Sequence, residues 1–186
     1  MKRIAIFIDG SNFNEAFKFA RFRPNYELIE RYFAQDGEVV GMYYFTALPP
    51  KEVHSPIRAI MDHIQYHGWN LITKETKTYG TVTKGNMDVE IVVQCWAMWE
   101  HFTDLVLFSG DGDFTSMVTE LQRRGRRVTC VSIHERGSDG GMVADELRRQ
   151  VNKFIDLREI MDYIRMGDGV KEIVPKPALS FLRGRA

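Results

Sequence analysis

An α/β fold with a mostly parallel central sheet and helices on both faces is what this sequence predicts. Apolar, β-branched segments typical of buried strands alternate with segments of helical periodicity along most of the chain. Such alternation favours parallel strands joined by right-handed crossovers. The 186 residues fit one domain, and 44% hydrophobic with 27% charged side chains is ordinary globular composition. No internal repeat or second domain is evident.

Charge and composition exclude several classes of protein. The 25 basic and 25 acidic side chains cancel, so a globally basic nucleic-acid-binding protein is excluded, whereas a local basic patch is not. The apolar run at residues 4–8 is too short for a signal peptide, and no stretch reaches the ~18 apolar residues of a membrane span. We therefore expect a cytoplasmic protein with no membrane segment. Cys95 and Cys130 are expected to be buried reduced thiols, with one disulfide as the alternative.

In the first half of the chain, several expected elements end at a residue type that interrupts them. Apolar, branched or aromatic runs mark strands, and apolar side chains recurring every three or four residues mark helices. Asp9 and Gly10 end the first strand, Ser11 and Asn12 are suited to cap the next helix, and Pro24 ends that helix. The expected elements are a strand over 3–8, a helix over 13–20, a helix over 26–35, a strand over 39–48, a helix over 53–67 and a strand within 69–78.

A polar, glycine-containing segment over 76–85 is expected to be a loop, after which the alternation resumes. Gly125 closes one of the later helices. Residues 137–141 are expected to form a flexible loop, and beyond Gly167 two prolines and two glycines indicate a mobile tail. The expected elements are a helix over 87–101, a strand over 105–108, a helix over 114–124, a strand over 128–133, a helix over 144–150, a strand over 154–157 and one or two helical turns from 158.

Two of the most apolar strands end in acidic turns, DGSN at 9–12 and SGDGD at 109–113. Ligands of an open α/β sheet bind beyond the carboxyl ends of its strands, where the strand order reverses. If these strands are neighbours, Asp9, Asp111 and Asp113 converge and repel one another, and a hard divalent cation with oxygen ligands relieves that repulsion. Mg²⁺ or Mn²⁺ fits this donor set, since the chain has no Cys/His set for zinc.

The alternative interpretation of these turns is local, because Asp and Ser commonly end strands and cap helices. A third acidic segment, KGNMD, places Asp88 in the first turn of a helix. A carboxylate there also interacts favourably with the positive end of the helix. As a fourth carboxylate it would complete a cluster of Asp9, Asp88, Asp111 and Asp113. Lys84, in the same segment, would then face a phosphate.

The ordered set IFIDGSN, KGNMD and LFSGDGDF resembles the NYN domain family, a PIN-like group of ribonuclease-related domains. The later segments RRGRRVTCVSI and MVADELRRQVNKFIDL are similar to its bacterial LabA-like branch, and the resemblance covers about residues 3–160. It implies a Rossmann-like PIN/NYN fold over residues 1–160 with a flexible extension over 161–186. It also implies a ribonuclease that hydrolyses RNA phosphodiester bonds with Mg²⁺ or Mn²⁺. The implied catalytic and metal-binding residues are Asp9, Asp88, Asp111 and Asp113, and the supporting substrate-binding residues are Ser11, Asn12, Lys84, Ser109 and Thr115.

Two positions depart from the family pattern, because many relatives carry Asp where this chain has Gln94 and Asn152. Each change keeps a polar side chain and removes a charge. They leave open a catalytically weak relative that acts as an RNA-binding, protein-interaction or regulatory module. A phosphatase of the HAD type or a Toprim-type nuclease fits less well, because the former needs D-x-D after its first strand and the latter needs Glu there.

Single-stranded RNA is the expected partner, and a homo-oligomer is possible. Tyr79 is available to stack on a base, and zero net charge predicts modest, salt-sensitive binding. The dense basic run at 123–127 lies at the amino edge of the sheet, away from the acidic turns, and suits a helix end. No histidine has a close spacing with the acidic motifs, so none is given a catalytic role. The basic residues better placed for RNA are Lys18, Arg21, Arg23, Lys74, Lys77 and Lys84, and those available for a dimer are Tyr43, Trp96 and Trp99.

Overall fold

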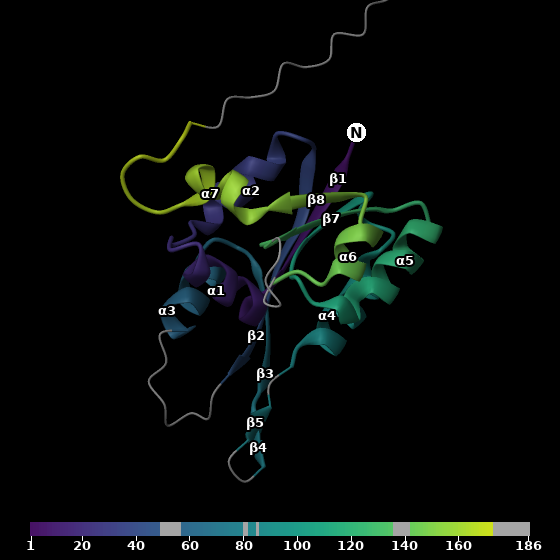
Figure 1. Cartoon of the computed structure of the whole chain (residues 1–186), viewed down its shortest axis with the longest axis horizontal. Coiled ribbons are helices and arrows are strands. Elements are labelled where there is room, and N and C mark those ends of the chain that lie inside the picture. The colour runs from purple at the N-terminus through teal and green to yellow at the C-terminus, as the bar shows by residue number, and fades with distance from the viewer. Residues whose placement is uncertain (49–56, 80–81, 85, 136–141, 173–186) are drawn as a thin grey trace, which may run out of the picture.

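The computed structural model of the chain is built around one parallel sheet. It describes residues 1–48, 57–79, 82–84, 86–135 and 142–172. The strands of the sheet are β1 (Arg3–Asp9), β2 (Glu38–Leu48), β3 (Asn70–Glu75), β6 (Asp104–Phe108), β7 (Arg127–Ser132) and β8 (Lys153–Asp156). All six pair in parallel, in the order β3-β2-β1-β6-β7-β8. Figure 1 shows this sheet running through the middle of the molecule with helices on either side.

Helices cover both faces of the sheet, which confirms the predicted fold class. One face carries α1 (Gly10–Phe19), α2 (Tyr26–Ala34), α3 (Ile57–Tyr66) and α7 (Leu157–Ile164). The other carries α4 (Asp88–Met98), α5 (Thr115–Arg123) and α6 (Asp145–Gln150).

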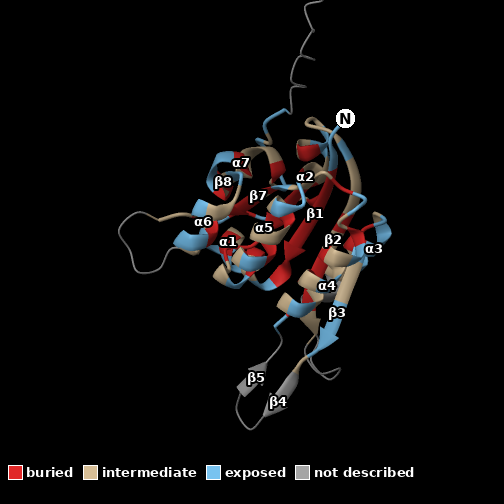
Figure 2. Cartoon of the chain, turned by 90° about the vertical axis from the view of Figure 1, so that its right-hand side faces the viewer, coloured by how far each residue is buried: buried red, intermediate tan, exposed pale blue. Residues whose placement is uncertain are grey.

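Burial on both faces explains why the central strands are continuously apolar. Successive side chains of a strand point to opposite faces, so Ile6 and Ile8 enter the cluster under α1 while Phe7 enters the cluster under α4. Figure 2 shows the buried residues concentrated on these central strands. Cys95 and Cys130 are both buried free thiols in the second cluster, so the expectation of reduced cysteines is confirmed.

The strand order reverses between β1 and β6. From β1 the chain moves outward through β2 and β3, then returns to place β6 on the other side of β1. Ile8 pairs with Phe108, so the two strands end side by side. The turns that follow them, 100 residues apart in the sequence, therefore start from the same place, as predicted.

Two local expectations are wrong. Ser11 and Asn12 do not cap the first helix; Asp9 does, because its carboxylate accepts the backbone N–H groups of both, and the helix therefore begins at Gly10. The expected loop over 76–85 contains an antiparallel hairpin of β4 (Lys77–Tyr79) and β5 (Val82–Lys84), whose threonine, tyrosine and valine residues are typical of strands.

Other expectations fall partly outside the described residues. These include the start of the helix predicted over 53–67, the loop over 137–141 and most of the tail after Gly167. Helix α7, the last in the described part of the chain, runs through residue 160 and buries Ile160 and Ile164. Within the described residues, no helix combines the length and apolarity required to span a bilayer.

Candidate metal centre

Asp9 is the most buried carboxylate at the end of the sheet, with 4% of its surface exposed. Its Oδ1 accepts hydrogen bonds from the Ser11 hydroxyl at 2.8 Å and from the backbone N–H groups of Ser11 at 3.2 Å and Asn12 at 3.3 Å. Its Oδ2 accepts one from the Ser109 hydroxyl at 3.1 Å. The chain therefore satisfies both oxygens of Asp9, which fixes the start of α1 against the second turn.

The second turn is held by the same polar network. The Ser109 hydroxyl accepts the Asp111 N–H at 3.2 Å, and Asn12 Oδ1 accepts the Gly110 N–H at 2.9 Å. Asp111 Oδ1 accepts the Asp113 N–H at 2.9 Å, which caps the short helix η1 (Gly112–Phe114). Asn12 and Ser109 thus join the two acidic turns rather than project freely into solvent.

Close packing explains why the two acidic turns have glycine at positions 10 and 110. A Cβ on Gly10 would lie 2.7 Å from the Phe45 carbonyl oxygen and 2.9 Å from the Tyr44 ring. A Cβ on Gly110 would lie 1.9 Å from the Met142 carbonyl oxygen. Both contacts are too short for a side chain, so each turn requires glycine for steric reasons.

Asp88 reaches the second turn from the other side, at the start of α4. Asn86 orients it, because the Asp88 N–H donates to Asn86 Oδ1 at 2.6 Å and the Asn86 amide donates to the Asp88 carboxylate. Carboxylate oxygens of Asp88, Asp111 and Asp113 all lie within 4.8 Å of one another. Asp88 and Asp111 are half-buried and Asp113 is exposed, so the group opens to solvent on one side.

The electrostatics of this group favour a cation. Burial raises the pKa of Asp88, and the negative charges of Asp111, Asp9 and Asp113 raise it further, against the lowering effect of the hydrogen bond from Asn86. A set of oxygen ligands of like charge matches the preference of Mg²⁺ or Mn²⁺. Asp9 is close enough to raise the pKa of Asp88, but it is not part of the three-carboxylate group found among the described residues.

The other expected site residues lie in different surroundings. Thr115 begins α5 beside the cluster, and its hydroxyl is buried without a hydrogen-bond partner in the described part of the chain. Lys74 forms an ion pair with Glu90 of α4 at 2.8 Å. The backbone of Lys84 ends β5, while its side chain lies outside the described residues.

The two departures from the family pattern have different positions relative to the cluster. Gln94 lies six residues along α4 from Asp88, about 9 Å by helix rise. Asn152 lies at the opposite edge of the sheet, where its Oδ1 accepts the Val128 N–H at 2.8 Å and the Gln122 amide at 3.2 Å. The missing charge at Asn152 is therefore remote from the acidic cluster.

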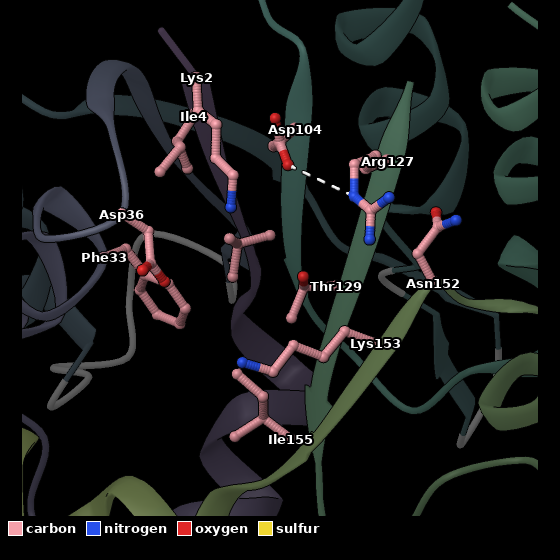
Figure 3. Close-up of a pocket in the computed structure, with 11 residues that line it drawn as sticks. Lys2, Ile4, Phe33, Asp36, Asp104, Arg127, Thr129, Asn152, Lys153 and Ile155 are labelled. Atoms are coloured by element: carbon pink, nitrogen blue, oxygen red, sulfur yellow. Dashed lines mark ion pairs between the residues drawn. The ribbon is translucent and has the colours of Figure 1, made fainter. Parts of the chain in front are cut away.

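Figure 3 shows the pocket at that amino edge, which has a volume of 90 Å³. Lys2 and Lys153 extend into it from opposite sides, and an ion pair of 4.0 Å joins Arg127 to Asp104. Because Asp36 and Asp104 also line this pocket, its charges are mixed.

Sequence reasoning assigned no role to two residues that shape the site. Asn86 orients Asp88, and its position two residues earlier within KGNMD was the available signal, since Asn side chains commonly bond the backbone two residues on. Tyr44 packs against Gly10 from β2; burial raises its pKa to about 12, and the Asp9 charge also raises it, so the phenol stays neutral. No local pattern marks Tyr44, because its contact depends on strand pairing.

The fold agrees with comparisons to known proteins. The chain belongs to the NYN domain family, whose profile matches residues 3–160, and it therefore carries a PIN-like, nuclease-related domain. It is 30% identical over 187 residues to Low amplitude and bright protein LabA of Synechococcus elongatus (strain ATCC 33912 / PCC 7942 / FACHB-805), covering 96% of each chain. The crystal structure of VPA0982, a protein of unknown function from Vibrio parahaemolyticus, has the same fold, with a TM-score of 0.70 and 22% identity over 89% of this chain and 96% of that one.

Proposed function

We propose that this protein is a metal-dependent ribonuclease that hydrolyses phosphodiester bonds of single-stranded RNA. The observation that carries the proposal is the grouping of Asp88, Asp111 and Asp113 within 4.8 Å where the strand order reverses. Membership of a PIN-like family supports the reaction class. The proposal includes Mg²⁺ or Mn²⁺ as the cofactor.

The four aspartates have different proposed roles because their surroundings differ. Asp88, Asp111 and Asp113 would hold the cation, which when bound supplies an activated water molecule and charge compensation for the phosphate. Asp9, whose oxygens are occupied by N–H and O–H donors, positions the turn that presents Asp111. That Asp9 also binds the cation directly stays a prediction.

Two hydroxyl groups and one lysine are suited to bind the substrate. The buried Thr115 hydroxyl has an unused donor at the start of α5, where it can meet a phosphate oxygen. Ser11 is exposed on the first turn of α1 and donates to Asp9, so it lies at the rim of the site. Lys84 is proposed to face the phosphate from the hairpin that precedes Asp88.

A second candidate is an RNA-binding or protein-interaction module with little catalysis. The observation in its favour is Gln94, because it removes a charge from the helix that begins with Asp88. Asn152 does not strengthen this candidate, since its hydrogen bonds lie at the other edge of the sheet.

Cleavage of a labelled single-stranded RNA by the purified protein tests the proposal. The assay compares Mn²⁺, Mg²⁺ and EDTA, and the variants Asp88→Asn and Asp111→Asn with Asp62→Asn, an exposed carboxylate on α3. We expect cleavage only with metal, a loss of more than about 100-fold in the two cluster variants, and full activity in Asp62→Asn.

Other outcomes separate the two candidates. Cleavage in EDTA, or full activity in Asp111→Asn, would contradict the proposed site. RNA binding without cleavage under all metal conditions would favour the binding module, and Gln94→Asp would then test whether one charge restores activity.

A further inference from the structure

A basic groove of 550 Å³ lies between the C-terminal ends of α1 and α7. Two short segments meet at its base, because the Asn25 N–H donates to the Ile164 carbonyl at 2.7 Å and the Met166 N–H donates to the Arg23 carbonyl at 2.8 Å. These two bonds form an antiparallel bridge between Pro24 and Arg165, which holds together the two segments that line the groove. Side chains that line it include Phe17, Lys18, Arg21, Arg23, Arg165 and Met166.

The charge of the groove is one-sided. Lys18, Arg21 and Arg23 are exposed, and none of them forms an ion pair within the described residues. Arg165 pairs with Asp162 at 3.7 Å, yet its Nε is buried and lacks a hydrogen-bond partner in the same part of the chain. A buried donor without an acceptor is costly, and an anionic oxygen would satisfy it.

Arg21 has a backbone conformation that glycine usually provides. Its φ is +56°, and it follows Ala20, the C-cap residue of α1. The Phe22 N–H donates to the Phe17 carbonyl at 3.1 Å, which is the bond of a glycine-type helix end. A long cation at a left-handed position is locally unfavourable for folding, and such strain is characteristic of functional sites.

The groove and the acidic cluster are joined by α1. The helix starts at Gly10, directly after Asp9, and its ten residues span about 15 Å. Ser11, Asn14 and Lys18 follow one another at helical spacing along it, with Glu15 the single carboxylate of the helix. A few nucleotides of extended strand cover this distance.

We propose that this groove binds the sugar-phosphate backbone of single-stranded RNA that runs along α1 into the acidic cluster. Lys18, Arg21, Arg23 and Arg165 contact phosphates, and the exposed Phe19 ring, with 49% of its surface accessible, offers a base a face on which to stack. The inference rests on the proposed function, since the same strand enters both sites. It predicts that the groove matters for long substrates and not for short ones.

Binding without cleavage tests the groove separately from the nuclease. Fluorescence anisotropy with Mg²⁺ in the Asp111→Asn background measures Kd for two RNAs, one of about 2 nucleotides that is too short to span α1 and one of about 16 nucleotides. Adding Lys18→Ala, Arg21→Gly and Arg23→Ala should raise the Kd of the long RNA about tenfold. It should also reduce the salt slope by about 2 and leave the short RNA unchanged. Arg123→Ala, which removes an exposed cation on α5, is the matched control and should have no effect.

Arg21→Gly alone separates binding from folding. Because glycine suits the left-handed conformation, the Tm should stay the same or rise while the Kd of the long RNA increases. If the triple variant and its parent bind the long RNA with the same Kd, the proposed role of the groove is wrong. If RNA binding depends on the groove but the wild-type protein never cleaves RNA, the proposed nuclease activity is wrong and the proposed RNA-binding groove is supported.

Discussion

At the scale of residues, the acidic site combines one carboxylate that accepts hydrogen bonds on both oxygens with three carboxylates grouped within 4.8 Å of one another. Asp9 accepts hydrogen bonds on both oxygens, whereas Asp88 has a raised pKa because burial and neighbouring charges disfavour its ionised form. A folded-state pKa above the ordinary value of 3.8 means that stability falls as the pH rises through the interval between the two values. Without a cation, the ionised cluster therefore lowers the stability of the fold at neutral pH.

Replacement of Asp88 by Asn should expose this cost. In EDTA at pH 7, Asp88→Asn is expected to raise the Tm by roughly 1–3 °C, because removing the charge relieves repulsion from Asp111, Asp9 and Asp113. The gain should shrink as the pH falls through the raised pKa of the wild-type carboxyl, and Mn²⁺ should stabilise the variant less than the wild type. Thermal denaturation beside Asp62→Asn measures both effects. A lower Tm for Asp88→Asn in EDTA would count against charge repulsion.

At the scale of elements, aspartates at strand ends play two roles that the local sequence does not separate. Asp9, Asp111 and Asp156 each follow or end a parallel strand and each caps the helix that comes next. The capping interpretation of the two acidic turns is therefore correct for Asp9 and Asp111, and it does not compete with a metal site at Asp111. Asp156 differs because the Arg158 guanidinium lies 2.7 Å away and compensates its charge.

Asp156→Ala should destabilise the junction of β8 and α7 without touching the acidic cluster. Burial raises the pKa of Asp156, but hydrogen bonds from the Arg158 side chain and from the Arg158 and His134 N–H groups outweigh it and hold the pKa below 3.8. Its stabilisation is therefore complete above that value and is lost as the pH falls through the lowered pKa.

Urea denaturation measures this contribution. At pH 7 we expect Asp156→Ala to reduce the free energy of unfolding by about 1–2 kcal/mol, the usual loss for a helix cap, with a smaller difference at about pH 2. Asp168→Ala, at an exposed carboxylate beyond α7, should leave stability unchanged. A difference that is the same at both pH values would refute the linkage to Asp156.

At the scale of the whole molecule, α7 completes the core over one face of the sheet. Ile160 and Ile164 are buried in the cluster that also holds Ile29 and Phe33 of α2. The Asn25–Ile164 backbone bond ties the end of this helix to the connection between α1 and α2. The folded unit therefore extends past residue 160, where the family match ends.

Ile164→Ala tests this extension of the core. Truncation of a fully buried isoleucine should lower the free energy of unfolding by about 2–5 kcal/mol. Met166→Ala, two residues beyond and 56% exposed, should lower it by less than about 0.5 kcal/mol. Chemical denaturation compares the two, and equal stabilities would show that residues beyond 160 do not contribute to the cooperative unit.

Much of this architecture was predictable because it depends on local patterns. The alternation of strands and helices predicted the fold class, and the acidic turns after two apolar strands predicted Asp9 and Asp111 at one edge of the sheet. The β4–β5 hairpin was not predicted because its strands are only three residues long and lie within a polar segment. Such short runs carry little periodicity, so turn-rich composition obscured them.

The sequence by itself determined the class of fold, the family and the residue types available for a cation. Only the tertiary structure decided which aspartates keep unbalanced charge, because capping and metal binding use the same side chain and differ in what the rest of the chain brings near. Ser109 reaches Asp9 across 100 residues, and Arg158 compensates Asp156. It also decided that Arg23 and Arg165 line one groove, since long-range backbone pairing, rather than local pattern, sets their distance.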